Sequence, residues 1–385
     1  MRGHVRKRGK TWAVVYDERR DENGRRVQRW RGGYRTKGEA EEALTKVINA
    51  LQTQTYVPPA KVTFKEYVLE TWWPHVEETR RPSTVDSYKR QLERHIYPVI
   101  GPIPLQKVSP SDVDRVYRVG AESGLQPNTI RVVGAIVSAA LAYAKRKGLV
   151  LHNVAENSDP PKAVRPQRTI WTARETARFL AAVEDDRLYA VWRLLAVTGA
   201  RRGEVCGLTW LNIDLEVGTV TIAQQLVPVG AELVFQAPKT TAGLRQVPID
   251  PATVEALERH RENQSLERQV IGAPAIDHDL VFTTLEGSPL NPRCLSQAFQ
   301  VRRTRAKLPH IRLHDLRHGA ATLALEGDVN LELIRRRLGH ARISTTIDLY
   351  ARHEIESAER AAADTVADLI DSRLQSVSKE EARPS

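Results

Sequence analysis

The sequence predicts a multidomain chain that is mainly α-helical with small β-sheets. It should contain a β-sheet-plus-helix domain, a helical bundle and a mixed α+β domain. Three observations lead to this prediction. Two proline-rich segments, residues 56–59 and 159–166, divide the 385 residues into three parts. The part before the first segment is strongly basic and rich in β-forming residues. Most of the remainder places apolar residues at helical spacing.

Positive charge is unevenly distributed along the chain. The whole sequence has 58 Lys and Arg residues against 47 Asp and Glu residues, a formal net charge of +11. Residues 1–38 hold 13 of the basic and 4 of the acidic residues, so most of the excess lies in a tenth of the chain. This distribution indicates an appended basic module that attracts polyanions. Nucleic acid is the partner it favours, although a basic surface that only maintains solubility would give the same count.

The first predicted domain, residues 1–56, is a small sheet followed by one helix. Its composition indicates strands at 11–16 and 25–32, a turn at 21–24 and a short third strand at 33–35. Thr36 and Glu39 have the spacing of a capping box, which opens a helix. Arginines on such a sheet suit contact with DNA grooves or phosphates. The alternative is a solvated hairpin whose arginines only prevent edge-to-edge aggregation.

The second predicted domain, residues 62–155, is a bundle of four helices. Their starts are marked by Thr63 with Glu66, by Pro82, by Ser109 with Pro110, and by Pro127. Four helices of this length can bury a core of their own. This part contains no catalytic cluster. Its basic residues could follow phosphates, but a solvated face is the simpler interpretation.

The third predicted domain, residues 168–375, mixes helices and short strands. Thr172 and Glu175 form a further capping box. Helices are expected at 173–184 and 187–197, strands at 218–223, 232–236 and 245–249, and more helices from 251 onward.

Two features indicate the compartment. Cys206 and Cys294 are the only cysteines and lack metal-ligand spacing, which suggests free thiols in a reducing environment. The longest apolar stretch, residues 132–144, is too short to cross a bilayer, and no signal peptide is visible. The sequence therefore predicts a cytosolic protein without a membrane partner.

Five short segments of the third domain concentrate residues that suit phosphodiester chemistry. They are residues 198–204, 238–241, 314–318 and 338–340, followed by Tyr350. The transition state of phosphoryl transfer carries negative charge that metal ions or fixed guanidinium groups must neutralise. Arginine binds two phosphate oxygens at once and stays charged at any working pH. A phenol suits a reversible reaction as nucleophile, and a lysine on a strand turn can protonate the leaving oxygen.

Each of these residues has a plainer interpretation when it is taken alone. Arg201 could be a surface arginine paired with Glu204, and Lys239 an ordinary turn lysine. His314 and His318 have the i, i+4 spacing of zinc ligands, but no third ligand of matching spacing is near, so we expect neither a metal nor a cofactor. Tyr350 could be an interfacial tyrosine. The order and spacing of the whole set favour the catalytic interpretation.

Four strings carry a family resemblance: TGARRGEV, PKTTAGLRQVPI, HDLRH and LGHARISTTIDLYARH. With them the third domain is similar to the catalytic domain of the tyrosine recombinases, the phage integrase family. The resemblance implies that two arginines clamp the scissile phosphate, a lysine protonates the leaving 5′ oxygen, two histidines assist, and a tyrosine attacks to leave a 3′-phosphotyrosyl link. These roles fall on Arg201, Arg317, Lys239, His314, His340 and the nucleophile Tyr350. Glu204 resembles the acid that supports the site from behind.

The resemblance extends to the other two domains. The helical part is similar to the family's core-binding domain, and the N-terminal sheet resembles the arm-binding domain of mobile-element integrases. It implies a homotetramer on paired double-stranded DNA attachment sites, with an excision factor and a host DNA-bending protein as further partners. Residues 358–370 are expected to form an apolar helix. In relatives such a helix packs on a neighbouring subunit, and here it could equally pack on its own domain.

Two other functions are compatible with parts of this sequence. A type IB-like topoisomerase shares the phosphotyrosine chemistry but needs no paired sites, and the basic N-terminal module argues against it. A catalytically silent DNA-binding regulator would use the same scaffold, and the intact catalytic set argues against that. The predicted function is therefore a site-specific DNA recombinase that integrates and excises a phage or other mobile element.

Overall fold

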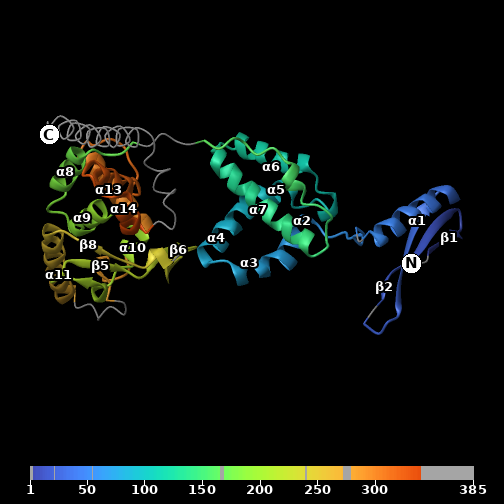
Figure 1. The fold of residues 1–385 in the computed structure, drawn as a ribbon, viewed down its shortest axis with the longest axis horizontal. Helices are drawn as coiled ribbons and strands as arrows, with labels where there is room; N and C mark the ends of the chain where they lie inside the picture. Colours follow the sequence, from blue (N-terminus) through green and yellow to red (C-terminus); the bar gives the residue numbers. More distant parts are fainter. Residues whose placement is uncertain are drawn as a thin grey trace, which may run out of the picture. The chain divides into compact units, whose positions relative to one another are not determined.

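A computed structural model of the chain describes residues 3–20, 22–53, 55–164, 169–238, 241–271 and 279–339 (Figure 1). The chain separates into two compact units, residues 1–165 and 166–385. The first unit contains two apolar cores, one under the N-terminal sheet and one inside a helical bundle. The second contains one large core. The predicted fold class, mainly helical with small antiparallel sheets, is confirmed.

The N-terminal sheet has three antiparallel strands in the order β1, β2, β3, followed by helix α1. Their bounds are β1 (Gly3–Arg8), β2 (Thr11–Arg20), β3 (Arg26–Tyr34) and α1 (Lys37–Gln52). The prediction was wrong about the third strand, because residues 33 and 34 end β3 and the unpredicted β1 completes the sheet. Five of the six residues of β1 are polar or glycine, so it lacks the apolar alternation that identifies a strand.

Helix α1 packs on the sheet through Ala40 and Val47, which contact Val14 and Tyr16 of β2. Its predicted N-cap is half correct. The Thr36 side chain accepts from the Glu39 backbone N–H at 3.2 Å. The Glu39 carboxylate accepts from the backbone N–H of Arg35 at 2.9 Å, one residue before the cap.

The helical bundle consists of four long helical segments, as predicted, and two of them contain a π-helical turn. The segments are α2 (Phe64–Tyr67), η1 (Val68–Trp72), α3 (Trp73–Thr79), α4 (Pro82–Gln91), η2 (Leu92–Ile96), α5 (Tyr97–Ile100), η3 (Leu105–Lys107), α6 (Pro110–Glu122), α7 (Pro127–Arg146) and η4 (Val154–Asn157). The π-helical turns η1 and η2 lie just before Pro74 and Pro98. Proline cannot donate to the carbonyl four residues earlier, and a π turn accommodates that gap. The second of these helical segments therefore continues past the predicted break at Pro98.

Helix α7 is the central helix of this bundle. It is the one helix of the described residues that is long and apolar enough to cross a membrane by length and composition. Eight of its residues are buried inside the bundle. A core helix of a bundle passes the same test of length and composition, and the packing of α7 gives it that role.

The second unit surrounds short strands with helices. Its helices are α8 (Ala173–Ala182), α9 (Tyr189–Thr198), α10 (Arg202–Cys206), α11 (Pro251–Ile271), α12 (Pro292–Arg305), α13 (Asp315–Glu326) and α14 (Leu331–Leu338), with short η5 (Trp210–Asn212) and η6 (Thr241–Gly243). Strands β4 (Ile213–Asp214), β5 (Thr219–Ile222) and β8 (Arg245–Pro248) form one sheet, and β6 (Gln225–Val229) pairs with β7 (Glu232–Gln236). The predicted strands are β5, β7 and β8, whereas β4 and β6 were not predicted.

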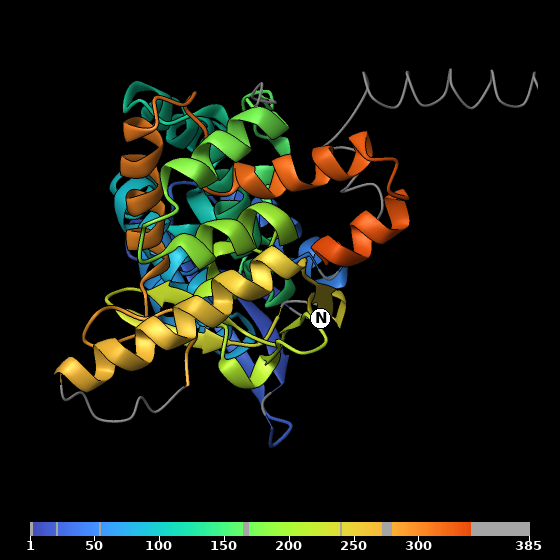
Figure 2. The same cartoon turned by 90° about the vertical axis from the view of Figure 1, so that its left-hand side faces the viewer.

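The core of the second unit places three helices around its functional residues. Trp171, Phe179, Trp192 and Phe299 pack together at its centre. Helix α13 lies beside α9, and α14 follows it (Figures 1 and 2). Two segments distant in the sequence, the end of α9 and the start of α13, are thereby brought to the same place. Both cysteines are free thiols, as predicted.

Candidate active site

A glycine at the end of α9 begins the site. Gly199 has a φ of +63°, in the left-handed region that favours glycine, and it caps the helix. A Cβ atom at this position would lie 2.7 Å from the Leu338 side chain at the end of α14. Glycine therefore provides both the turn and the close approach of α14. The turn brings Arg201 to the N-cap of α10.

Arg201 is held by Glu204 through two contacts. The Arg201 backbone N–H donates to Oε2 at 2.8 Å, and Nη1 donates to Oε1 at 2.7 Å. The Arg201 side chain is 38% exposed, while that of Glu204 is 4% exposed. The sequence alone was compatible with a surface ion pair between Arg201 and Glu204. The ion pair is present, but the Glu204 carboxylate is buried. The Arg201 side chain is therefore partly open to solvent, while the buried Glu204 carboxylate fixes its position.

Glu204 also binds a second arginine, Arg245, which begins β8. Nη2 of Arg245 donates to Oε2 at 2.9 Å, and Nη1 donates to Oε1 at 3.2 Å. Burial alone would raise the pKa of Glu204. The hydrogen bonds and charge of Arg245, together with Arg201, outweigh burial and lower that pKa to about 2. The carboxylate is thus charged at any working pH and bridges two guanidinium groups.

This depressed pKa predicts a loss of stability in acid. Below the unfolded value of 4.5 the unfolded chain takes up a proton at Glu204 that the folded chain refuses until about pH 2. Stability is therefore present above pH 4.5 and falls as the pH is lowered through this window. The loss from this group should be on the order of 3 kcal/mol. Glu204→Gln should be less stable at pH 7 and lack that acid-dependent part, measured by denaturant unfolding at several pH values.

The half-exposed pair of Glu332 with Arg335 provides a matched control. It has the same i, i+3 spacing as Arg201 and Glu204, with Nε of Arg335 at 2.6 Å from the carboxylate. The hydrogen bonds of Arg335 and Arg336 lower the pKa of Glu332 as well. Solvent screens such a pair, so Glu332→Gln should leave the pH profile unchanged. Equal profiles for Glu204→Gln and the wild type would contradict the prediction.

Arg317 is the second arginine of the predicted clamp, and it is buried at the start of α13. Its Nη1 donates to the Gly199 carbonyl oxygen at 2.7 Å, and its Nη2 donates to the Leu338 carbonyl oxygen at 2.6 Å. These carbonyls close α9 and α14, where the helix dipoles are negative. Two helix ends therefore orient this guanidinium and offset part of the cost of burying its charge.

His314 caps the N-terminus of α13, one turn before His318. By surface area His314 is exposed, yet neighbouring protein desolvates the imidazole, and Arg317 and Arg201 add positive charge. These effects, desolvation first, lower the pKa of His314 to about 4. The ring is neutral at pH 7 and can donate or accept one hydrogen bond beside the arginines. Its ring centroid is 5.3 Å from that of His318. Among the described residues no group of three or more His, Cys, Asp or Glu could hold a metal ion.

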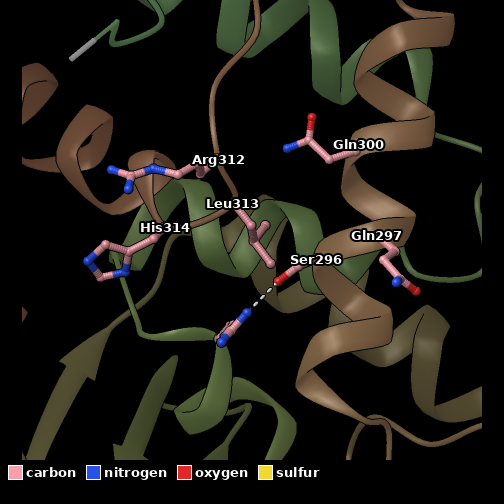
Figure 3. Close-up of a pocket in the computed structure, with 7 residues that line it drawn as sticks. Ser296, Gln297, Gln300, Arg312, Leu313 and His314 are labelled. Atoms are coloured by element: carbon pink, nitrogen blue, oxygen red, sulfur yellow. Dashed lines mark hydrogen bonds between the residues drawn. The ribbon is translucent and has the colours of Figure 1, made fainter. Parts of the chain in front are cut away.

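An open hollow of about 640 Å³ lies beside His314 (Figure 3). Figure 3 shows His314 and Arg312 on one side and Ser296, Gln297 and Gln300 of α12 on the other. Nη1 of Arg202, which also lines the hollow, donates to the Ser296 hydroxyl at 2.8 Å. Guanidinium, hydroxyl and amide groups of this kind bind DNA phosphates and base edges.

The structure thus brings together four of the seven predicted residues: Arg201, Glu204, His314 and Arg317. The charges of Arg201 and Arg317 both act on His314, and Arg317 binds the turn two residues before Arg201. Lys239, His340 and Tyr350 lie outside the described residues. The segments next to two of them converge: a Cβ on Gly339 would lie 2.8 Å from the Ala242 carbonyl oxygen.

Sequence reasoning missed Arg245. It lies inside the string PKTTAGLRQVPI, in a predicted strand. The burial pattern of β8 alternates, with Arg245 and Val247 buried and Gln246 and Pro248 exposed. An arginine in register with a buried valine was the signal available, because a buried guanidinium needs a buried acid or several carbonyls as partners.

Comparison with protein families gives three matches along the chain. Residues 4–51 match the Arm DNA-binding domain, residues 63–118 the phage integrase N-terminal SAM-like domain, and residues 170–356 the Phage integrase family. The chain is 26% identical over 371 residues to a tyrosine recombinase XerC-like protein of Caldanaerobacter subterraneus subsp. tengcongensis, covering 91% of this chain and 94% of that one. It is 24% identical over 337 residues to the ICEBs1 integrase of Bacillus subtilis, covering 87% and 91%.

Solved structures share the fold. The Tn1549 transposon integrase in complex with transposon right end DNA matches with a TM-score of 0.69 at 22% identity, over 79% of this chain and 99% of that one. A lambda integrase dimer bound to a core site matches with a TM-score of 0.56 at 16% identity, over 90% and 94%. The three domain matches, the full-length relatives and this fold together show that the chain belongs to the phage integrase family of tyrosine recombinases, enzymes that break and rejoin DNA strands.

Proposed function

We propose that this chain is the integrase of a phage or other mobile element, which joins and separates DNA at paired attachment sites through a 3′-phosphotyrosyl intermediate. One observation carries the proposal. Arg201 and Arg317 come from segments more than 100 residues apart, yet Arg317 binds the Gly199 carbonyl two residues before Arg201, and the charges of both arginines act on His314. Three cationic or hydrogen-bonding side chains around one point suit a single phosphodiester.

In the proposed reaction, four of the predicted residues bind or support the phosphate, and Lys239, His340 and Tyr350 complete the chemistry. Arg201 and Arg317 neutralise the charge that develops on the scissile phosphate. Neutral His314 donates a hydrogen bond or carries a proton, and Glu204 keeps Arg201 in place. Lys239 protonates the leaving 5′ oxygen, and His340 hydrogen-bonds the phosphate. Tyr350 attacks phosphorus, so that its oxygen replaces the 5′ oxygen and the bond energy is kept for resealing.

We infer a division of labour among three domains: an arm-type DNA-binding domain at 1–56, a core-binding domain at 62–155 and a catalytic domain at 168–375. The main apolar core of each part and the three family matches support these bounds. The last two domains would bind the crossover site, and the first would bind distal arm sites. The protein would act in the bacterial cytosol, where its DNA lies.

The proposed assembly is a homotetramer on two DNA sites. Support comes from a lambda integrase tetramer bound to a Holliday junction, which shares this fold with a TM-score of 0.55. An excision factor and a host DNA-bending protein are proposed as further partners, because arm and core sites on one DNA must be folded together to reach the same protein.

Covalent capture tests the function. The substrate is the DNA that flanks the gene, nicked next to a repeated core sequence so that a cleaved strand end diffuses away. We expect a complex that resists denaturant and forms in EDTA. Binding without a covalent complex would indicate the silent regulator. Relaxation of supercoiled plasmid that lacks any attachment site would indicate the topoisomerase.

Removal of residues 1–56 should separate two activities. Integration between full attachment sites should be abolished, because distal arm sites lose their ligand. Covalent cleavage of a minimal core site should be retained within about threefold, because the other two domains have cores of their own. Gel-shift titration and covalent capture, run in parallel, measure the two effects. Loss of core cleavage with retained circular dichroism would show that the domain division is wrong.

A further inference from the structure

We propose that Arg245 is a positioning residue for strand cleavage, which fixes Arg201 relative to the segment that leaves α14 toward His340 and Tyr350. The inference rests on the proposed function. The contacts that support it all lie within the described residues. Nothing in the family resemblance assigned Arg245 a role, and its contacts within the described residues are with Glu204 and two backbone carbonyls.

The Arg245 guanidinium contacts three separate segments of the second unit. Nη1 and Nη2 donate to the two Glu204 carboxylate oxygens at 3.2 and 2.9 Å. Nη1 also donates to the Gly243 carbonyl oxygen at 3.2 Å. Nε donates to the Arg337 carbonyl oxygen at 2.7 Å. The side chain is only 6% exposed, so water cannot replace these partners.

Each contacted segment adjoins a residue with a proposed catalytic role. Glu204 is the acid that holds Arg201. Gly243 ends the short helix η6, four residues after Lys239. Arg337 lies in the last turn of α14, three residues before His340. One rigid group thus sets the mutual distances of three catalytic segments.

The end of α14 is held by two buried arginines on neighbouring carbonyls. Arg245 takes the carbonyl of Arg337, and Arg317 takes that of Leu338. Gly339 then turns the chain in the left-handed region, with φ +67°. A Cβ there would lie 3.0 Å from Nη1 of Arg245, so the glycine lets the guanidinium approach the turn. The direction in which the chain leaves α14 is therefore fixed by the same two arginines.

Only arginine fits these contacts. Its planar fork presents donors in fixed directions, whereas the ammonium group of lysine is a compact point charge that would reach part of the set. A buried ion pair is in general no more stabilising than apolar side chains of similar volume. An apolar pair would fill the same space without orienting Arg201 or α14, and orientation is what the arginine adds.

The test is single-turnover covalent capture at saturating DNA, which separates the rate from the fraction of active protein. Arg245→Met should lower the rate roughly 100-fold, the effect of a misplacement of about 1 Å in an active site. DNA affinity and the final amount of complex should stay close to wild type. Arg245→Lys should recover part of the rate.

Arg187 supplies a matched control with similar contacts elsewhere in the unit. It binds Glu267 through two hydrogen bonds of 2.7 and 2.8 Å and donates to the carbonyls of Thr283 and Thr284. Arg187→Met should lower stability yet leave the cleavage rate within about twofold of wild type. If Arg245→Met behaves in the same way, losing active protein but not rate, Arg245 is structural and the inference is overturned.

The outcomes also distinguish this inference from the proposed function. A wild-type protein that forms no covalent complex on any DNA refutes the function, and the inference with it. If the wild type cleaves and Arg245→Met cleaves at the same rate, the inference about Arg245 is refuted while the proposed function stands.

Discussion

Tyr350→Phe is expected to eliminate the covalent protein–DNA complex while leaving DNA binding intact. Phenylalanine keeps the ring and lacks the oxygen that would become esterified to the phosphate. Loss of the nucleophile should reduce cleavage on the order of 10⁵-fold or more, below the limit of detection in covalent capture. Binding depends on phosphate contacts by Lys and Arg and should keep its steep salt dependence.

Tyr189→Phe is the matched control, because Tyr189 and Tyr350 are the two tyrosines of residues 166–385. Tyr189 begins α9, and the Arg259 guanidinium lies 5.2 Å from its ring centroid, a contact that phenylalanine retains. We expect this variant to form the covalent complex in full. A complex that persists in Tyr350→Phe would show that another residue is the nucleophile.

Arg317→Lys should reduce the cleavage rate by about 10²–10³-fold, the effect of removing a donor that stabilises a transition state. Lysine retains the positive charge, so a loss would come from geometry. The guanidinium uses Nη1 and Nη2 to bind the last carbonyls of α9 and α14 in fixed directions. An ammonium group can reach one of these carbonyls or a phosphate oxygen. It lacks the planar set of donors with which a guanidinium contacts several acceptors in fixed directions. Rates come from single-turnover capture at saturating DNA.

Arg335→Lys is the control for this substitution. Arg335 lies on the neighbouring helix α14 and binds Glu332 through two part-buried hydrogen bonds. Its replacement should leave cleavage unchanged, since a lysine maintains a half-exposed ion pair of small energetic value. An Arg317→Lys variant that cleaves at the wild-type rate would contradict the proposed phosphate clamp.

The sequence by itself determined most of the helix starts, and it predicted a catalytic set. The Thr63 and Thr172 capping boxes are present as predicted, and Ser109 forms one with Asp112. These signals are readable because a cap depends on residues three positions apart, which are adjacent in any folded chain. The family strings are equally local. These strings identified Arg201 and the other residues that are predicted to act with it.

The tertiary structure alone decided how these residues are held. Glu204, which holds Arg201, binds Arg245 across 41 residues of sequence, and Arg317 binds helix ends 118 and 21 residues away. No local pattern encodes such distances, because burial determines which charges must pair and burial depends on the packing of the whole unit. For the same reason β1 was missed: its polar residues form a strand only because β2 offers them a partner edge.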